Sequence, residues 1–337
     1  MLRVGLIGLG YIGGVHARSI VANSRMTLSA VYARSSSSRK SFAAQYGARC
    51  AERLEDLIAA PDVDAVIIAS STDSHSDIAI QVARTGKPMY CEKPIALNLE
   101  RARKAVETLK TFNVPIMVGF NRRYAPSHAA VHREVQAGRV GKLHLLQMTS
   151  RGPQSPPPLE YLKKSGGFFR GKGVHFFDLA RFIAEDEVVE VSAMGAALAH
   201  PFIGELGDYD TSVAILRMGG GTLCQIDNAR TAAYGYDERI EAFGPGGMVE
   251  SCRVPQVGFR RTQGTSLVNE SFPQNNFERV GESFARAMDA FASWILDGTG
   301  RVPTMDDALA AQTIAEAATL SAVQHRVVSI TELSTSR

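Results

Sequence analysis

The strongest constraint on this chain is a glycine pattern that begins at its eighth residue. A short apolar run at residues 4–7 leads directly into Gly8-Leu-Gly10-Tyr-Ile-Gly13, and a helical pattern follows. A strand, a glycine turn and a helix in this order form the dinucleotide fingerprint. The first glycine permits a tight turn, the second lets the backbone approach a pyrophosphate, and the third lets helix and strand pack closely. A nucleotide-binding domain is therefore predicted, with these residues at the cofactor: Gly8, Gly10, Tyr11, Ile12 and Gly13.

Strands and helices alternate along the first 120 residues. Apolar strand-like runs lie at residues 3–7, 27–32, 65–69, 88–91 and 115–120, and helical patterns lie at 12–23, 37–46, 54–60, 77–85 and 99–112. Buried apolar strands that alternate with helices are typical of a parallel, doubly wound sheet. The sequence therefore predicts an α/β Rossmann domain at residues 1–120, in which Asn98 caps the last helix.

The pattern changes after residue 120. Strand-like runs at 143–150, 190–199, 210–218, 222–228, 239–243 and 248–252 are joined mostly by turn-length gaps, and Gly244-Pro-Gly-Gly247 signals a hairpin. Helical patterns lie at 127–137, 173–183 and 305–323, and Phe284, Met288 and Phe291 share another helical stripe. Residues 121–337 are predicted to form an α+β domain with a mostly antiparallel, open sheet. A partner subunit is expected to cover its helix-free face, in a homodimer or homotetramer.

Composition excludes several classes of function. The formal net charge is +3 over 337 residues with no lysine–arginine block, which argues against a nucleic acid partner. No apolar run approaches ~18 residues, so no membrane-spanning helix is expected, and a strand that starts at residue 3 leaves no room for a signal peptide. The four scattered cysteines show no metal-ligand spacing. A cytoplasmic protein with reduced thiols and no metal site is expected.

Several motifs, taken in order, resemble one family. They are Gly8-Leu-Gly-Tyr-Ile-Gly13, Ile68-Ala-Ser-Ser-Thr-Asp-Ser-His75, Cys91-Glu-Lys-Pro94, Gly119-Phe-Asn-Arg-Arg-Tyr124, Ser165-Gly-Gly-Phe168 with His175-Phe-Phe-Asp178, and Tyr234-Gly-Tyr-Asp-Glu-Arg239 with Glu241-Ala-Phe-Gly244. The chain resembles the glucose–fructose oxidoreductase, inositol dehydrogenase and rhizopine-catabolism (Gfo/Idh/MocA) family. It is most similar to the inositol dehydrogenase branch, through residues 161–167 and 234–239.

The resemblance implies an NAD(P)-dependent oxidoreductase. It would transfer hydride between a nicotinamide and a secondary alcohol of a cyclitol, polyol, sugar or sugar acid. Lys93 is implied as the cation at the reacting oxygen, and His175 as the proton-transferring group. Taken alone, Lys93 also fits a surface lysine before a proline turn, and His175 fits a structural histidine. Three roles are open for Asp178, which lies three residues further on. It orients His175, it contacts the substrate, or it is simply a solvated or buried polar residue.

Two positions depart from the family pattern. The acidic residue expected four positions before His175 is Gly171, and a second acidic position is Gly152. Two hypotheses follow. In the first, the substrate is anionic and pairs with Arg170 or Lys172. In the second, Lys93 and His175 suffice and simple cyclitols react slowly. The same departures keep open a non-catalytic NAD(P)-binding sensor or regulator.

The end of the second strand bears on the choice of cofactor. NAD-type sites want a carboxylate there, and this chain has Ala33, followed by Arg34 and Ser35. An arginine and a hydroxyl can hold a 2′-phosphate, so NADP(H) is predicted as the preferred cofactor and NAD(H) as the alternative. An exposed arginine at a strand end is the simpler interpretation. Further predicted cofactor residues are Ser70, Thr72, His75, Glu92, Lys93, Asn121 and Arg122. Of these, Ser70, Thr72 and His75 could instead cap a helix near Asp77. Further predicted substrate contacts are Arg151, Tyr161, Tyr234 and Asp237.

Overall fold

The chain divides into two compact units. The computed structural model describes residues 1–152, 158–164, 166–253, 260–263, 266–269, 272–273 and 275–334. Unit 1 comprises Met1–Asn121 and Ser283–Ala310, and unit 2 comprises Arg122–Glu282 and Ala311–Arg337. From sequence, residues 121–337 are predicted to form the second domain, whereas the structure groups residues 283–310 with unit 1. Phe284 packs edge-on against His16 at 5.6 Å between ring centroids, and the Val118 N–H donates to the Pro303 carbonyl at 2.9 Å.

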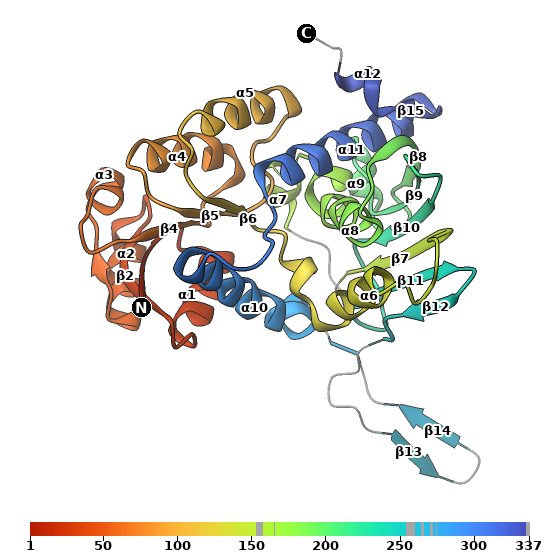
Figure 1. Cartoon of the computed structure of the whole chain (residues 1–337), viewed down its shortest axis with the longest axis horizontal. Helices are drawn as coiled ribbons and strands as arrows, with labels where there is room; N and C mark the ends of the chain where they lie inside the picture. Colours follow the sequence, from red (N-terminus) through yellow and green to blue (C-terminus); the bar gives the residue numbers. More distant parts are fainter. Residues whose placement is uncertain are drawn as a thin grey trace. The chain divides into compact units, whose positions relative to one another are not determined.

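Unit 1 is built on a six-stranded parallel sheet with the order β3-β2-β1-β4-β5-β6 (Figure 1). Its strands are β1 (Leu2–Ile7), β2 (Met26–Tyr32), β3 (Arg49–Cys50), β4 (Ala65–Ile68), β5 (Met89–Cys91) and β6 (Ile116–Val118). The five strands other than β3 match the predicted runs closely. The chain order reverses between β1 and β4, and in such sheets ligands bind beyond the carboxyl ends of the strands at this switch point.

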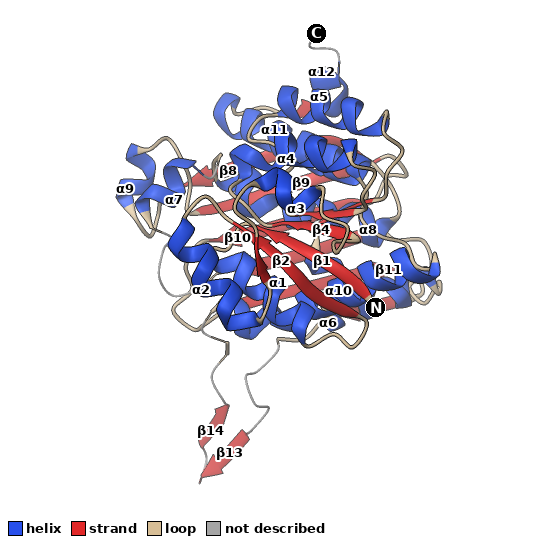
Figure 2. Cartoon of the chain, turned by 90° about the vertical axis from the view of Figure 1, so that its left-hand side faces the viewer, coloured by secondary structure: helices blue, strands red, loops and turns tan. Residues whose placement is uncertain are grey.

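Helices flank the sheet of unit 1 (Figure 2). They are α1 (Tyr11–Val21), α2 (Ser36–Tyr46), α3 (Leu54–Ile58), α4 (Thr72–Arg84) and α5 (Leu99–Lys110). Asn98 caps α5 as predicted, because its side-chain oxygen accepts the Arg101 N–H at 2.9 Å. Helix α4 begins at Thr72 rather than near Asp77. Its first turn closes through polar groups, since both the N–H and the hydroxyl of Ser74 donate to the Ser71 carbonyl.

Unit 2 contains a seven-stranded mixed sheet with the order β12-β11-β7-β10-β9-β8-β15. Its strands are β7 (Leu145–Arg151), β8 (Val188–Ala196), β9 (Thr211–Met218), β10 (Leu223–Ala229), β11 (Asp237–Gly244), β12 (Gly247–Glu250) and β15 (Val328–Ser329). Only β7 and β10 pair in parallel among these strands, so the predicted, mostly antiparallel sheet is confirmed. The predicted hairpin joins β11 to β12, where Gly244 pairs with Gly247. A separate two-stranded sheet joins β13 (Arg260–Gln263) and β14 (Ser266–Asn269).

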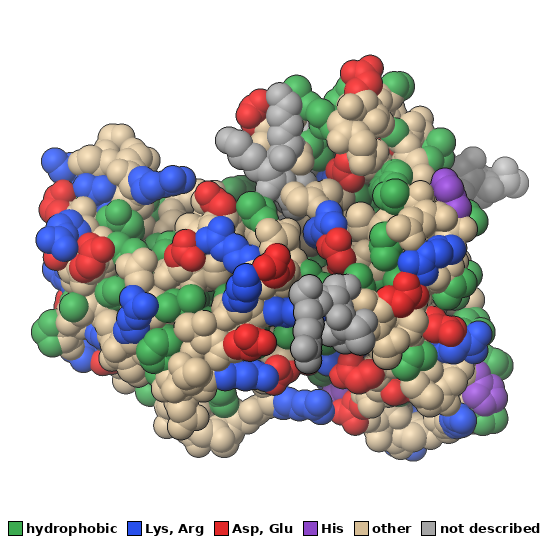
Figure 3. Space-filling view, turned by 90° about the horizontal axis from the view of Figure 1, so that it is seen from above, with side chains coloured by type: hydrophobic (Ala, Val, Ile, Leu, Met, Phe, Trp, Pro, Cys, Tyr) green, Lys and Arg blue, Asp and Glu red, His purple; other side chains and the backbone are tan. Residues whose placement is uncertain are grey.

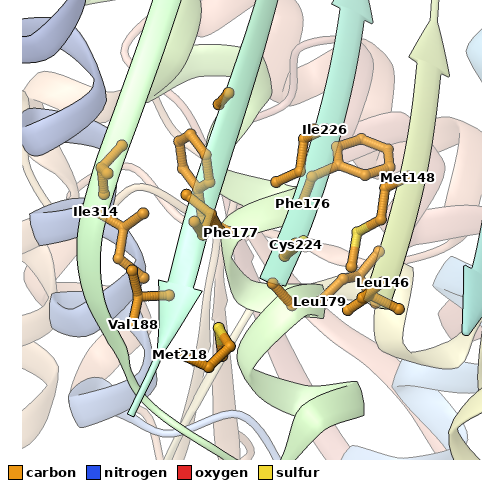
Figure 4. Close-up of a cluster of buried hydrophobic side chains, with 14 of the residues drawn as sticks. Leu146, Met148, Phe176, Phe177, Leu179, Val188, Met218, Cys224, Ile226 and Ile314 are labelled. Atoms are coloured by element: carbon orange, nitrogen blue, oxygen red, sulfur yellow. The ribbon is translucent and has the colours of Figure 1, made fainter. Parts of the chain in front are cut away.

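One face of the seven-stranded sheet packs against helices. The helical segments of unit 2 are η1 (Asn121–Tyr124, beginning at the boundary), α6 (Pro126–Gln136), α7 (Leu159–Lys164), the π-helix η2 (Phe169–Gly173), α8 (Val174–Ala184), α9 (Pro201–Glu205) and α12 (Ile330–Ser334); α10 (Asn276–Asp297) and α11 (Met305–Gln324) each begin in one unit and end in the other. Phe176, Phe177 and Leu179 of α8 and Ile314 of α11 join apolar side chains of the strands in one buried cluster (Figure 4). Helix α8, which carries His175, is therefore held firmly against the sheet.

The surface mixes charges of both signs. On the face shown in Figure 3, lysine and arginine side chains alternate with aspartate and glutamate rather than gathering in one basic area. Within the described part of the chain, no helix combines the length and the apolar character needed to cross a membrane.

Candidate functional site

Two of the three fingerprint glycines are required by the packing of the chain itself, and the third leaves its backbone uncovered. Gly8 has a φ of +93°, and a Cβ there would lie 2.4 Å from the Ser70 backbone nitrogen. A Cβ on Gly13 would lie 2.0 Å from the Gly8 carbonyl oxygen, so α1 packs this closely only with glycine at that position. A Cβ on Gly10 would meet nothing within 4 Å, so its backbone is open to a ligand. The loop thus presents bare backbone at the N-terminus of α1, which favours an anion.

A cavity of about 740 Å³ opens beside this loop, a size typical of ligand sites. Its walls come from the glycine loop, the end of β2 and the segment after β4. Eight of the predicted cofactor residues line it: Gly8, Gly10, Tyr11, Ile12, Ala33, Arg34, Ser35 and Ser70. The lining includes the glycine loop and several serines, and backbone N–H groups and hydroxyls are groups that can bind the phosphates and ribose of a dinucleotide.

The end of β2 lacks the carboxylate that an NAD site prefers. Arg34 is the single charged side chain among the described residues that line the cavity. The Ser35 hydroxyl accepts the Ser38 N–H at 3.3 Å and so caps α2. The Arg39 side chain stabilises this turn, because it donates hydrogen bonds to the carbonyls of Ala33 and Arg34 at 2.8 and 3.2 Å. Arg34 therefore projects from a backbone that is fixed by its neighbours.

Thr72 and His75 lie in the first turn of α4 and not before it, which corrects the expected helix start near Asp77. His75 is buried, and both of its ring nitrogens face carbonyl oxygens. Nδ1 lies 2.8 Å from the Pro94 oxygen, and Nε2 lies 2.9 Å from the Ser70 oxygen. His75 thus links the cavity wall at Ser70 to the segment that follows β5.

Glu92 and Lys93 follow the last residue of β5. The Glu92 side chain is buried, and its Oε1 lies 2.8 Å from Nε2 of His16. Burial alone would raise the pKa of Glu92, but the hydrogen bond with His16 and the charge of Lys93 lower the pKa below its usual value. The segment therefore carries an ionised carboxylate directly before Lys93.

Asn121 and Arg122 are both buried, and they are consecutive residues that belong to different units. In unit 1, the Asn121 side chain donates to the Ser283 hydroxyl at 2.8 Å. In unit 2, Arg122 pairs with Glu238 at 3.1 Å and donates to the Tyr236 hydroxyl at 3.3 Å. Burial opposes ionisation of Glu238, but the charges of Arg122 and Arg279 hold its pKa at about 2. Glu238 is not predictable as a site residue from sequence, since no local pattern pairs it with an arginine 116 positions away.

His175 lies in the first turn of α8, directly after the π-helix η2. π-helical turns are rare and are frequent at functional sites. Asp178 is fully buried. Its carboxylate accepts hydrogen bonds from Nε and from a terminal nitrogen of Arg123, at 2.8 and 2.6 Å. Of the roles that the sequence left open for Asp178, the structure shows a buried ion pair.

The segment around Gly171 distinguishes two cations that the sequence left equivalent. Arg170 forms a two-pronged pair with Glu316, at 2.8 Å for each contact, and donates to the Gly166 carbonyl. Lys172 instead donates to the Ala229 carbonyl, and its Nζ would lie 2.8 Å from a Cβ on Gly152. Burial lowers the pKa of Lys172 to about 7. The glycine at position 152 therefore makes room for the Lys172 amine.

Three predicted substrate contacts lie together at one end of the sheet of unit 2. Arg151 on β7 is the register partner of Asp237 on β11. Arg151 pairs with Asp227 at 2.8 Å and lies 3.4 Å from the Tyr234 hydroxyl, which donates to Asp237 at 2.9 Å. These groups form a polar cluster with partners of their own. The side chain of Tyr161 lies outside the described residues.

Comparison with known proteins covers both units. The family model of oxidoreductases with an NAD-binding Rossmann fold matches residues 2–120, and the GFO/IDH/MocA C-terminal domain matches residues 128–250. Inositol 2-dehydrogenase of Rhizobium meliloti (strain 1021) is 38% identical, with 98% of this chain and 99% of that protein covered. Myo-inositol 2-dehydrogenase of Thermotoga maritima is 35% identical over the same shares.

A solved structure extends this similarity. The crystal structure of scyllo-inositol dehydrogenase from Lactobacillus casei with bound NAD(H) and scyllo-inositol matches with a TM-score of 0.90 and 25% identity, over 98% of this chain and 99% of that chain. Both the sequence and the fold are thus shared along nearly the whole length, including the segments that carry Lys93 and His175. The chain therefore belongs to the GFO/IDH/MocA family of oxidoreductases.

Proposed function

We propose that this chain is a nicotinamide-dependent dehydrogenase that interconverts a secondary alcohol of a cyclitol or related polyol and the corresponding ketone. The observation that carries the proposal is the similarity to inositol dehydrogenases over nearly the full chain, one of them with NAD(H) and scyllo-inositol bound. The open backbone at Gly10 and the cavity beside it support the same conclusion. The non-catalytic sensor receives no support from these comparisons.

We assign the chemistry to two side chains. A bound nicotinamide dinucleotide supplies the hydride acceptor. The imidazole of His175 takes the hydroxyl proton as the carbon–hydrogen bond breaks, and it returns that proton in the reverse direction. The ammonium group of Lys93 stabilises the negative charge that develops on the oxygen.

A substrate panel tests this proposal. The purified chain is incubated with NAD or NADP and with myo-inositol, scyllo-inositol, aldoses or sugar acids, while the nicotinamide absorbance is followed. We expect turnover of at least one cyclitol. Tight dinucleotide binding without turnover of any compound would return the non-catalytic sensor to consideration.

We propose further that NADP is the preferred cofactor. Arg34 lines the cavity and can pair with a 2′-phosphate, and Ala33 stands where NAD sites have a carboxylate that would repel this phosphate. Replacing Arg34 by alanine is expected to lower kcat/KM with NADP about 10-fold or more, since a charge-assisted hydrogen bond contributes roughly 1.5–3 kcal/mol. The value with NAD should change by less than about threefold. Initial rates with both cofactors measure this difference.

Arg53→Ala is the matched control, because Arg53 is an exposed arginine of unit 1 that does not line the cavity. It should leave both values unchanged. If Arg34→Ala reduced kcat/KM equally for the two cofactors, Arg34 would not read the 2′-phosphate.

A sugar acid is a second candidate substrate, and Lys172 is the observation that favours it. Arg122, Arg170 and Arg230 each pair with a carboxylate, whereas the acceptor found for Lys172 among the described residues is a backbone carbonyl. With a pKa of about 7, the amine loses its charge as the pH rises through neutrality. We expect KM for a sugar acid to rise about tenfold between about pH 6 and pH 8, and KM for a neutral cyclitol to stay constant.

Steady-state kinetics at several pH values measure this, with Lys172→Met as the variant that should remove the pH dependence. Equal pH dependence of KM for the acid and for the neutral cyclitol would exclude the pairing of Lys172 with a carboxylate. In that case the neutral cyclitol remains the proposed substrate.

We propose a second copy of the chain as the occupant of the sheet face in unit 2 that the described helices leave uncovered. Exposed apolar side chains gather there from neighbouring strands: Met194, Val213, Ile215, Leu223, Phe243 and Met248. Met194 and Val213 are direct register partners, so the apolar area is continuous across strands. A monomeric mass in solution would exclude this homo-oligomer.

A further inference from the structure

The carboxylate of Glu92 joins two parts of unit 1. Its Oε1 lies 2.8 Å from Nε2 of His16, on the helix that starts at the glycine loop. Its Oε2 accepts the backbone N–H of Lys93 at 3.3 Å. One buried carboxylate thus connects the cofactor-binding helix to the peptide of the proposed catalytic lysine.

The surroundings of His16 direct its ring towards Glu92. The ring is fully buried, with edge contacts to Tyr90 at 5.1 Å and to Phe284 at 5.6 Å. Its second nitrogen, Nδ1, has no hydrogen-bond partner among the described residues. With a proton on Nε2, the ring donates a hydrogen bond to Glu92. Among the described residues, the hydrogen-bond partner of the buried His16 ring is therefore the Glu92 carboxylate.

The Glu92 carboxylate lies close to the backbone that follows β6. A Cβ on Gly119, the residue after β6, would lie 3.0 Å from the carboxyl carbon and from Oε2 of Glu92. Glycine at position 119 therefore leaves the room that the carboxylate occupies. The charged or titratable side chains that act on Glu92 are His16 from α1, His75 from α4 and Lys93 beside it, and all three favour the ionised form.

A second histidine holds the other side of Lys93. Nδ1 of His75 lies 2.8 Å from the carbonyl oxygen of Pro94. The residues before and after Lys93 are thus each fixed by a buried histidine, one from α1 and one from α4. Since a shift of about 1 Å at a reacting group can cost roughly 100-fold in rate, such anchoring matters for the position of an ammonium group.

We propose that His16 is a positioning residue that acts on Lys93 through Glu92, and that it couples the glycine-loop helix to the lysine. This inference rests on the proposed function, in which Lys93 stabilises charge on the substrate oxygen. His16 itself contacts no reacting atom in this proposal. Its substitution should therefore lower kcat while the dinucleotide still binds.

The test compares His16→Leu with His16→Gln. We expect kcat to fall about 10- to 100-fold in His16→Leu, with the Kd for the dinucleotide changed by less than about threefold. His16→Gln should recover part of the loss, because its amide N–H can still donate to Oε1 of Glu92. His144→Leu, which removes an exposed histidine, is the control and should keep full activity.

Glu92→Gln supplies a readout that a purely structural role would not move. Removing a negative charge next to Lys93 disfavours the ammonium form, so the alkaline limb of the pH–rate profile should shift to lower pH. Circular dichroism and the Tm identify variants that fail to fold, and the measurements are then made on the variants that fold.

Lys93→Met separates failure of this inference from failure of the proposed function. Suppose that Lys93→Met loses activity. The positioning role of His16 is then wrong if His16→Leu keeps kcat within about twofold, or if His16→Leu and His16→Gln lower kcat equally. If Lys93→Met itself keeps full activity, the proposed role of the lysine fails first.

Discussion

Replacing Lys93 by methionine is expected to lower kcat/KM for cyclitol oxidation about 10²- to 10³-fold. Methionine keeps most of the length of lysine but removes the charge that stabilises the developing alkoxide, and the loss of one such donor has an effect of this size. The dinucleotide should still bind, because the residues that line the cavity are unchanged. Stopped-time or continuous assays with saturating cofactor measure the loss.

Lys104→Met is the matched control for this substitution. Lys104 is an exposed lysine on α5 of the same unit, and its contact is an i,i+4 pair with Glu100. Surface pairs of this kind contribute little to stability. Lys104→Met should therefore retain full activity, whereas equal activity of the two variants would show that Lys93 has no part in the reaction.

Replacing His175 by alanine is expected to lower kcat about 10²- to 10⁴-fold, the range that general acid–base catalysis contributes. A general base must be neutral to accept a proton, so activity in the wild-type chain should rise as the pH increases through the pKa of the base. In His175→Ala this acidic limb of the pH–rate profile should disappear, and the residual rate should follow hydroxide concentration.

His325→Ala, at an exposed position in unit 2, serves as the control for this variant and should keep the acidic limb. Retention of the limb in His175→Ala would assign the proton transfer to a different group. The buried Asp178–Arg123 pair holds α8 in either case, so loss of the fold is not expected from the substitution at position 175.

Much of unit 1 could be predicted from sequence because its signals are local. Apolar strands and the glycine fingerprint place the sheet and the cavity, and Asn98 is the predicted cap of α5. Strand β3 was missed, since two residues give no periodicity. The start of α4 was missed as well, because residues 72–76 are mostly polar and form their first turn through local hydrogen bonds.

The grouping of residues 283–310 with unit 1 had no signal in the sequence. The stripe with Phe284 predicts a helix, but it does not say which side chains will cover the apolar face. Likewise, the parallel pairing of β7 with β10 joins strands 78 positions apart at Thr149 and Asp227, and no local pattern records such a pairing. Contacts over long separations are fixed only when the whole core assembles.

The candidate site shows the same division. The glycine loop, Arg34 and the positions of Lys93 and His175 follow from motifs. Which of Arg170 and Lys172 has a carboxylate partner could not be predicted, because Glu316 lies 146 positions from Arg170. The role of His16 could not be predicted either, because no local pattern around this histidine indicates that its ring contacts Glu92, 76 positions away.

Isotope transfer tests the central claim most directly. A cyclitol carrying deuterium on its ring carbons is oxidised by the chain, and the reduced nicotinamide is analysed by NMR. Direct hydride transfer from a secondary alcohol predicts deuterium at C4 of the nicotinamide, on one face of the ring, with none in the solvent. Reduced nicotinamide without deuterium, or no reduction with any cyclitol, would contradict the account.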